Sequence, residues 1–484
     1  MKKKFRNSGY SEGGASRTKK TLKTWQPQHF DSVADIDYNL SVLRNRAADL
    51  AMNSPMGAAA IQTQLSGVIN EGLNIFPRLN HEALGIDSSA ARKWNRKVKA
   101  EFEFWSENQQ VDYYQRNTFK ELQRIAYLSA LTDGDDFCIF RRKVPTAANP
   151  YSLKLQLIEA QRVSNPQGNK SVLVGGAVES NLPNGGRIIN GVEVDAHGVL
   201  KAIWISNRIY NQPNNARAEL KWQRVKVYGD KTGTRNVLHI CNDSRIGQYR
   251  GEPYLSPVIE TLKNLSRYAE AELVSGIIKS YFSLFFTQLG DNSFKLNQIL
   301  PDDDLDVTQY KLGAGTLNAL PRGVDVKAID STGATSFSTY TEYFSKVVGA
   351  ALGLPLEVLI KSFNSSYSAS KAALLQAENE FRQRKKSFVT DFCQPVYEAF
   401  LTEAVALGRI DAPGFFEDAY LRKIYCAADW HNETAHYLDA VKEVQAAEKR
   451  IALGLSTHER ETAQLVGGDY YENLRQLKEE QSNG

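Results

Sequence analysis

Residues 337–375 read FSTYTEYFSKVVGAALGLPLEVLIKSFNSSYSASKAALL. Apolar residues recur at helical spacing from Phe337 to Ala351, which predicts a helix over that stretch. Gly353-Leu-Pro355 ends it, because proline disfavours helical backbone at the preceding residue and glycine permits a reversal of the chain. Lys361–Ser370 is rich in hydroxyl groups and nearly free of charge, and a long helix is predicted from Lys371. The pattern is therefore helix, break, polar loop and long helix.

The chain on either side of this stretch predicts a mixed α and β protein. Helical spacing is found at Ile36–Leu50, Pro55–Val68 and over residues 90–132. Short segments rich in β-branched and aromatic residues then predict strands at Phe137–Phe140, Leu153–Ile158, Gly191–Val194, Ala202–Ile205 and Val225–Tyr228. At 484 residues the chain is long enough for two to four sub-domains.

Another long helix is predicted on the N-terminal side of residues 337–375. Ser256 is a suitable N-cap and Pro257 a suitable first residue, and helical spacing continues to about Phe286. Residues 287–335 are strand-like and turn-rich, with a net acidic composition that includes Asp302, Asp303, Asp304 and Asp306. Two long helices thus bracket a small α/β module.

The C-terminal third of the chain is predicted to be helical. Pro395 should kink the helix over Ser370–Leu407, and Gly408 should end it. Helices follow at 433–453 and 470–480, with Ser456–Glu459 reading as a capping box between them.

Charge is concentrated at the N-terminus. Residues 1–24 hold eight Lys or Arg against one Glu, while the whole chain has a net charge of only +4, so the rest is slightly acidic. A body that gripped DNA by neutralising phosphates should be basic, which excludes tight DNA binding by the body. Residues 1–29 are expected to form a disordered, solubilising basic tail, with a nucleic-acid contact as the alternative.

Several functional classes find little support. Four widely spaced cysteines give neither a disulfide framework nor a zinc pattern, no apolar run is long enough for a membrane span, and no phosphate-binding loop or cofactor motif is present. Tyr367-Ser-Ala-Ser-Lys371 matches the Tyr-x-x-x-Lys of short-chain dehydrogenases, and Ser368-x-x-Lys371 matches a hydrolase motif. The dinucleotide-binding glycine turn that the former chemistry needs is missing. The expectation is therefore no enzyme, no metal and no cofactor, with a Tyr-Lys or Ser-Lys enzyme or a monomeric DNA-binding scaffold as alternatives.

Several motifs in a fixed order resemble those of the portal proteins of lambda-type tailed phages. They are Gly353-Leu-Pro355 with Tyr367-Ser-x-x-Lys371-Ala-x-Leu-Leu375, Gly247-Gln-Tyr-Arg-Gly-Glu-Pro253, Gly191-Val-Glu-Val-Asp-x-x-Gly198, Phe102-x-x-Trp105 and Gly134-Asp135. The resemblance extends over roughly residues 30–480. One departure is that His431-Asn432 follows Trp430, where the family usually has Asp-Pro.

The resemblance implies an α+β portal fold with named parts. These are an α/β wing (30–254), a first stem helix (255–286), a small α/β clip (287–335), a second stem helix (336–352), a tunnel-loop region (353–370), a long kinked helix returning to the wing (371–431) and a helical crown (432–484).

The resemblance also implies a function and partners. The family forms a ring, usually a homododecamer, at one capsid vertex, through which double-stranded DNA is packaged and ejected. Its partners are the large terminase, head–tail connector proteins and the major capsid or scaffolding protein, in the virion and in the host cytoplasm during assembly, with no membrane. By this resemblance Lys361, Asn364, Ser365, Ser366 and Ser368 are expected to face the DNA channel, and Asp302, Asp303, Asp304 and Asp306 are expected to dock partners at the clip.

Overall fold

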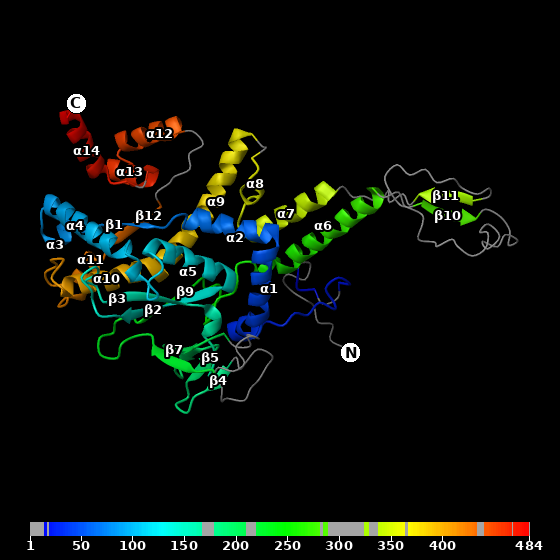
Figure 1. The fold of residues 1–484 in the computed structure, drawn as a ribbon, viewed down its shortest axis with the longest axis horizontal. Coiled ribbons are helices and arrows are strands. Elements are labelled where there is room, and N and C mark those ends of the chain that lie inside the picture. The colour runs from blue at the N-terminus through cyan, green and yellow to red at the C-terminus, as the bar shows by residue number, and fades with distance from the viewer. Residues whose placement is uncertain are drawn as a thin grey trace, which may run out of the picture.

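The computed structural model describes residues 14–16, 19–166, 179–209, 219–280, 284–288, 324–328, 337–363, 366–432, 440–466 and 468–483. The fold is α+β, with helices grouped around antiparallel sheets and one pair of long helices projecting from the body (Figure 1). None of the helices in these ranges combines the length and the hydropathy that crossing a membrane requires.

The N-terminal part of the body is helical, as predicted. Ser54 caps the second helix by accepting a hydrogen bond from Gly57 N, and Thr118 and Glu121 form a capping box on the last. The elements are a π-helical turn at Val33–Asp37, α1 (Leu40–Asn53), α2 (Pro55–Val68), α3 (His81–Leu84), α4 (Ser88–Ser106), a 3₁₀ turn at Gln109–Val111 and α5 (Phe119–Asp133).

Two antiparallel sheets follow. In the first, of order β3-β2-β9, the central strand places Phe137 between Ile158 and His239. The second is a meander in the order β4-β5-β6-β7-β8. The strands are β2 (Asp135–Arg142), β3 (Leu153–Ile158), β4 (Glu179–Asn181), β5 (Arg187–Ile189), β6 (Val192–Val194), β7 (Leu200–Ser206), β8 (Trp222–Lys226) and β9 (Val237–Cys241). All five predicted strands are present, the last of them shifted a few residues toward the N-terminus.

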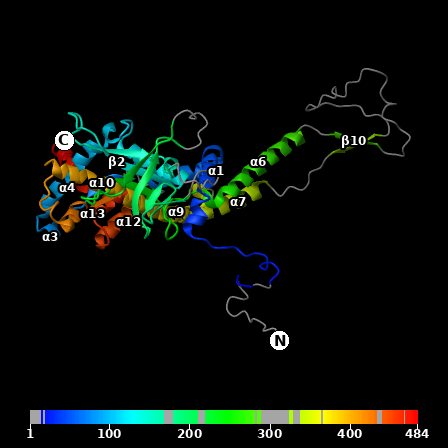
Figure 2. The same ribbon diagram turned by 90° about the horizontal axis from the view of Figure 1, so that it is seen from below.

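The projecting pair consists of α6 (Ile259–Ser280) and α7 (Phe337–Ala351), which lie side by side in Figures 1 and 2. The predicted bounds of the second helix are correct. The first ends at Ser280, because strand β10 (Leu284–Gln288) pairs with β11 (Val324–Ala328) inside the stretch predicted as helix up to Phe286. Short apolar runs suit either structure, and here strand pairing prevails. Ser256 begins a 3₁₀ turn, Ser256–Val258, and is not a cap, since its buried Oγ makes no hydrogen bond among the described residues.

The long helix after the polar loop begins earlier than predicted, at Tyr367. It runs as α9 (Tyr367–Phe388) into a π-helical turn at Val389–Cys393 and then into α10 (Gln394–Ala406). The irregular turn lies directly before Pro395, which has no N–H for the carbonyl one turn back, so the predicted effect of this proline is confirmed. Gly408 ends the helix with a φ of 69°, as expected.

The C-terminal helices pack on one side of the body. They are α11 (Ala419–Tyr425), α12 (Ala440–Ala452), α13 (His458–Val466) and α14 (Tyr470–Asn483). The first part of the predicted helix from 433, residues 433–439, lies outside the described residues. The cap of α13 is Thr457, whose Oγ1 accepts from Arg460 N, so the capping box predicted at Ser456 is wrong by one residue.

An aromatic core holds the body together. Phe102 lies 5.1 Å from Phe400 and 5.7 Å from Phe119 between ring centroids, and Trp105 lies 5.2 Å from Phe400. Each fully buried side chain of this size stabilises the fold by roughly 2–3 kcal/mol. Trp430 joins this core from strand β12 (Ala428–His431), which pairs with β1 (Asn74–Pro77) and so ties the end of the body to its beginning.

Candidate functional site

The backbone reverses at two positions on the way into the polar loop, at Gly353 and at the first residue of the loop, Lys361. Gly353 has a φ of 70°, and a Cβ there would lie 3.1 Å from Glu380 Cδ, so glycine is the residue that fits. After α8 (Leu356–Leu359), Lys361 has a φ of 53°, a left-handed conformation that is uncommon for lysine. The lysine side chain is exposed. These two turns present the loop away from the aromatic core.

The structure places only some of the predicted loop residues. Ser366 and Ser368 are exposed, and their hydroxyl oxygens lie 3.2 Å apart. Ser368 belongs to the first turn of α9 and not to a loop, because this helix begins at Tyr367. Asn364 and Ser365 lie outside the described residues, as do all four aspartates of the predicted docking cluster at 302–306.

Tyr367 and Lys371, the pair in the dehydrogenase-like motif, contact the C-terminal helices. Lys371 Nζ lies 3.2 Å from Glu443 Oε1, and Lys442 Nζ lies 5.4 Å from the centre of the Tyr367 ring. The lysine is therefore paired with a carboxylate on α12 and does not serve the phenol. In the described ranges no cluster of three histidine, cysteine or acidic side chains could hold a metal ion.

The projecting helix pair is held by an aromatic ladder. Tyr268 of α6 contacts Tyr340 and Phe337 of α7, with ring centroids 4.1 and 5.7 Å apart, and Tyr340 contacts Phe344 at 4.4 Å. These residues belong to the apolar stripe that predicted α7. The stripe is thus used within the chain to join the two long helices.

Other apolar side chains of the same two helices are uncovered. Leu273 is 66% exposed and Tyr343 61%. Further exposed members are Val274, Ile277, Phe337 and Val347. Several exposed apolar side chains on one pair of helices favour an interaction site there.

A buried arginine fastens the root of this helix pair to the sheet. Arg250 lies in Gly247–Pro253, just before α6, and has no exposed surface. Its Nε and Nη2 donate to the two carboxylate oxygens of Asp135, at 2.7 and 3.2 Å. Its other donors reach three carbonyl oxygens, those of Ala160, Val163 and Asn190. All five N–H groups of the guanidinium are therefore used.

Asp135, at the start of β2, is the centre of this cluster. It also accepts from Arg44 Nη2 at 2.6 Å and from Gly251 N at 3.0 Å, and His239 Nε2 lies 3.1 Å away. Four elements, α1, β2, β9 and the 247–253 segment, thus meet at one carboxylate.

The ionisation of the cluster follows from its burial. Burial alone would raise the pKa of Asp135, but the charges of Arg250 and Arg44 outweigh it and hold that pKa well below its ordinary value. Burial raises the pKa of Asp136 well above the ordinary value and that of Asp37 to about 6. Asp135 therefore keeps its negative charge in spite of its burial, because the two arginines stabilise the carboxylate.

Two glycines, Gly134 and Gly251, allow the backbone beside Asp135 to approach the backbone beside Arg250 closely. A Cβ at Gly251 would lie 2.0 Å from Gly134 O, and one at Gly134 would lie 2.3 Å from Gly251 O. No side chain fits at either position, so the two backbones touch directly. Gly134-Asp135 and the Gly247–Pro253 motif are far apart in the sequence but contact each other directly in the fold. This contact between the two segments is called the joint below.

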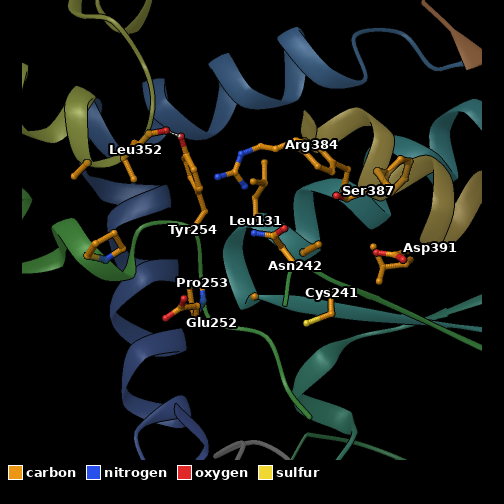
Figure 3. Close-up of a pocket in the computed structure, with 17 residues that line it drawn as sticks. Leu131, Cys241, Asn242, Glu252, Pro253, Tyr254, Leu352, Arg384, Ser387 and Asp391 are labelled. Carbon is orange, nitrogen blue, oxygen red and sulfur yellow. Dashed lines mark hydrogen bonds between the residues drawn. The ribbon is translucent and has the colours of Figure 1, made fainter. Parts of the chain in front are cut away.

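Tyr254, which directly follows the Gly247–Pro253 motif, connects the joint to the end of α7. Its hydroxyl donates to Leu352 O at 2.6 Å and accepts from Gln64 Nε2 at 2.8 Å, and Arg384 covers its ring at 4.7 Å. Figure 3 shows Tyr254, Leu352 and Arg384 on the wall of a cleft of about 190 Å³ between α5, β9 and α9. Tyr254 thus links the start of α6 and the segment before Gly353-Leu-Pro355.

Gly134-Asp135 and Gly247–Pro253 therefore meet at one joint between the sheet and the two projecting helices. Sequence reasoning treated each motif separately and missed Arg250, Asp135 and Tyr254 as a unit. The signal was the placement of glycines beside both charged residues, since adjacent glycines are typical of a tight backbone approach.

The sequence of the chain is similar to those of known phage proteins. The family model of phage portal proteins, lambda family, matches residues 18–385. Portal protein B of Escherichia phage lambda is 23% identical over 97% of this chain and 88% of its own length. The portal protein of Escherichia phage N15 is 23% identical over 97% of this chain and 89% of its own length. A chain from the neck of a native gene transfer agent particle superposes with a TM-score of 0.42, 11% identity and coverage of 88% of this chain and 92% of that one.

The match over most of the chain defines its class as a structural component of a phage head. The chain belongs to the lambda family of phage portal proteins, and its function is that of a portal at the capsid vertex.

Proposed function

We propose that copies of this chain form a closed ring, a homododecamer, through which double-stranded DNA enters and leaves the capsid. The observation that carries this proposal is the projecting α6–α7 pair, which leaves apolar side chains such as Leu273 and Tyr343 uncovered in the single chain. A closed ring covers such a surface by a heterologous contact repeated around an axis. Negative-stain images of the purified chain test it, with rings around a central opening as the expected result.

The loop between α7 and α9 is proposed to line the DNA channel. Lys361, Ser366 and Ser368 are exposed in the part of this segment that the structure describes, and Asn364 and Ser365 complete the proposed set. Hydroxyl and amide groups offer weak contacts to phosphates, while one lysine per subunit touches them only transiently. A channel that conducts DNA has to avoid strong neutralisation of the phosphates, which this composition satisfies.

The sub-domains, partners and location belong to the same proposal. Residues 30–254 with 371–431 act as the wing, α6 and α7 as the stem, the 287–335 segment as the clip and residues 432–484 as the crown. The large terminase and the head–tail connector dock on the clip, and the capsid or scaffolding protein contacts the ring, which assembles in the host cytoplasm. The role is structural and not enzymatic, which agrees with the pairing of Lys371 to Glu443.

Removal of residues 1–24 is expected to leave ring formation intact. This segment has too few apolar residues to join a core. Native mass spectrometry of the truncated chain should give the same number of subunits per ring as the full chain. Failure to assemble, or insolubility, would show instead that the segment is structural.

Charge reversal in the clip is expected to separate assembly from docking. Asp303→Lys combined with Asp304→Lys should leave the ring intact and weaken binding of a partner, because exposed charges mainly tune association rate and specificity. Tail attachment and packaging are the measurements, with Asp303→Asn and Asp304→Asn as a milder control. Unchanged attachment in the lysine variant is the result that refutes a docking role.

A further inference from the structure

Residues 23–31 form an N-terminal arm that the body of the same chain does not cover. Every residue from 23 to 31 is exposed, in an extended stretch without regular structure. Trp25 is 66% exposed and Phe30 52%. Large aromatic side chains at this exposure, on a segment with few internal contacts, have an apolar surface available for a partner.

The C-terminal end of the arm is held against the body by hydrogen bonds, while the residues before it extend away from the body. Arg245 donates to Phe30 O at 2.7 Å and pairs with Asp35, and Ser32 Oγ donates to Gly247 O at 2.7 Å. The arm is therefore anchored on the segment that also contains Arg250. Trp25 lies five positions before the anchored Phe30, which gives the indole a reach of roughly 17 Å from this anchor.

The direction of the arm favours a protein partner over DNA in the channel. In Figure 1 the N-terminal segment leaves the body on one side of the α6–α7 pair, and α8 with the proposed channel loop lies on the other. Figure 2 shows the arm turning away from its own body. In the single chain the arm therefore lies on the side of the helix pair that is opposite to α8.

α6 offers a groove on its distal half. The groove has a volume of about 490 Å³ and is lined by Ala269, Glu272, Leu273, Gly276, Ile277 and Phe337. A Cβ at Gly276 would meet nothing within 4 Å, so the floor of the groove is open. The lining is apolar apart from the carboxylate of Glu272. An apolar groove suits the indole ring, and the carboxylate can accept a hydrogen bond from the indole N–H.

Charge makes the two surfaces complementary. Residues 19–30 contain Lys19, Lys20 and Lys23 and no acidic residue, whereas residues 268–277 contain Glu270 and Glu272 and no basic one. In the single chain the arm leaves Trp25 exposed and the α6 groove open. The partner that carries this groove in every ring is a second copy of the chain.

We infer that the arm of one subunit binds to the neighbouring subunit in the ring, with Trp25 inserted in the α6 groove of that neighbour. This inference rests on the proposed ring. It adds a second link to the helix contacts, since the arm reaches over the outside of the interface. Tryptophans in such pockets are frequent hot spots, so loss of the indole should raise the concentration for half-assembly about 30-fold.

The first experiment measures assembly of Trp25→Ala, with Gln28→Ala as the matched control on the same exposed arm. Gly276→Phe fills the groove without displacing its surroundings and should weaken assembly by a similar factor. Combining Trp25→Ala with Gly276→Phe should cost little more than either alone, because both remove one contact. Native mass spectrometry across a dilution series gives all four values.

The second experiment identifies which copy receives the arm. Rings are assembled from a mixture of Gln26→Cys and Gly276→Cys chains and treated with a short bis-maleimide, so that a link between the two positions can only join different chains. Cross-linked dimers absent from either variant alone are the expected result. If the wild type forms rings, then mixed Gln26→Cys and Gly276→Cys rings that give no such dimer, or equal assembly of Trp25→Ala and Gln28→Ala, overturn the inference alone. Absence of rings from the wild type overturns the proposed function and this inference together.

Discussion

Arg250→Met should destabilise the folded subunit by about 3–5 kcal/mol, because it leaves a buried carboxylate without its main partner. The guanidinium has no exposed surface and gives five hydrogen bonds, two of them to Asp135. Methionine fills similar space but supplies no donor, so three carbonyl oxygens also lose their partners. Since typical domains have 5–15 kcal/mol of stability, little folded subunit should accumulate.

Arg245→Met is the control, because it removes the same charge from the same segment five residues away. Arg245 is partly exposed and pairs with Asp35 near the surface. Its loss should cost about 1 kcal/mol or less. Urea denaturation of both variants gives the comparison. Equal stability of the two would mean that the buried cluster does not hold the joint.

The second large effect is expected at the loop. Ser365→Arg combined with Ser366→Arg should stall DNA packaging at low salt while ring assembly survives. Each added phosphate contact steepens the log–log salt dependence of DNA binding by about one unit, and a ring multiplies the gain over all its subunits. Ser366 is exposed and its side chain does not cap α9, so the substitution there removes only the exposed contact with the Ser368 hydroxyl.

Two further variants make this result specific to charge and to the channel. Ser365→Gln with Ser366→Gln adds bulk without charge and should package normally. Tyr367→Phe removes the phenol that a dehydrogenase requires, and a channel loop should tolerate it because the side chain is half exposed. Normal packaging by the double arginine variant at low salt would place the loop away from the DNA path.

Much of the helical architecture was predictable because local signals set it. Ser54 and Pro55 start α2, and Gly353 and Gly408 end their helices with left-handed backbone, as glycine allows. The elements that differed depend on distant partners. Phe285 and Phe286 suit a helix by spacing, but they lie in a strand because β10 pairs with β11.

The joint was harder to predict, for a physical reason. An arginine in a glycine-rich segment is usually an exposed turn residue, and Arg250 is buried only because Asp135, Ala160, Val163 and Asn190 surround it. Those partners come from three separate segments that no local pattern relates. The interlocked Gly134 and Gly251 were visible as motif residues, but their contact follows only from the three-dimensional fold.

Native mass spectrometry of the purified full-length chain, followed by electron microscopy of the same sample, tests the central claim most directly. The account predicts a closed ring of about twelve subunits around an open channel, by heterologous contacts that close on themselves. Rings of more than one size would still agree with it, because scaffold or capsid protein can fix the subunit number. A sample that contains only monomer or dimer at micromolar concentration would contradict it.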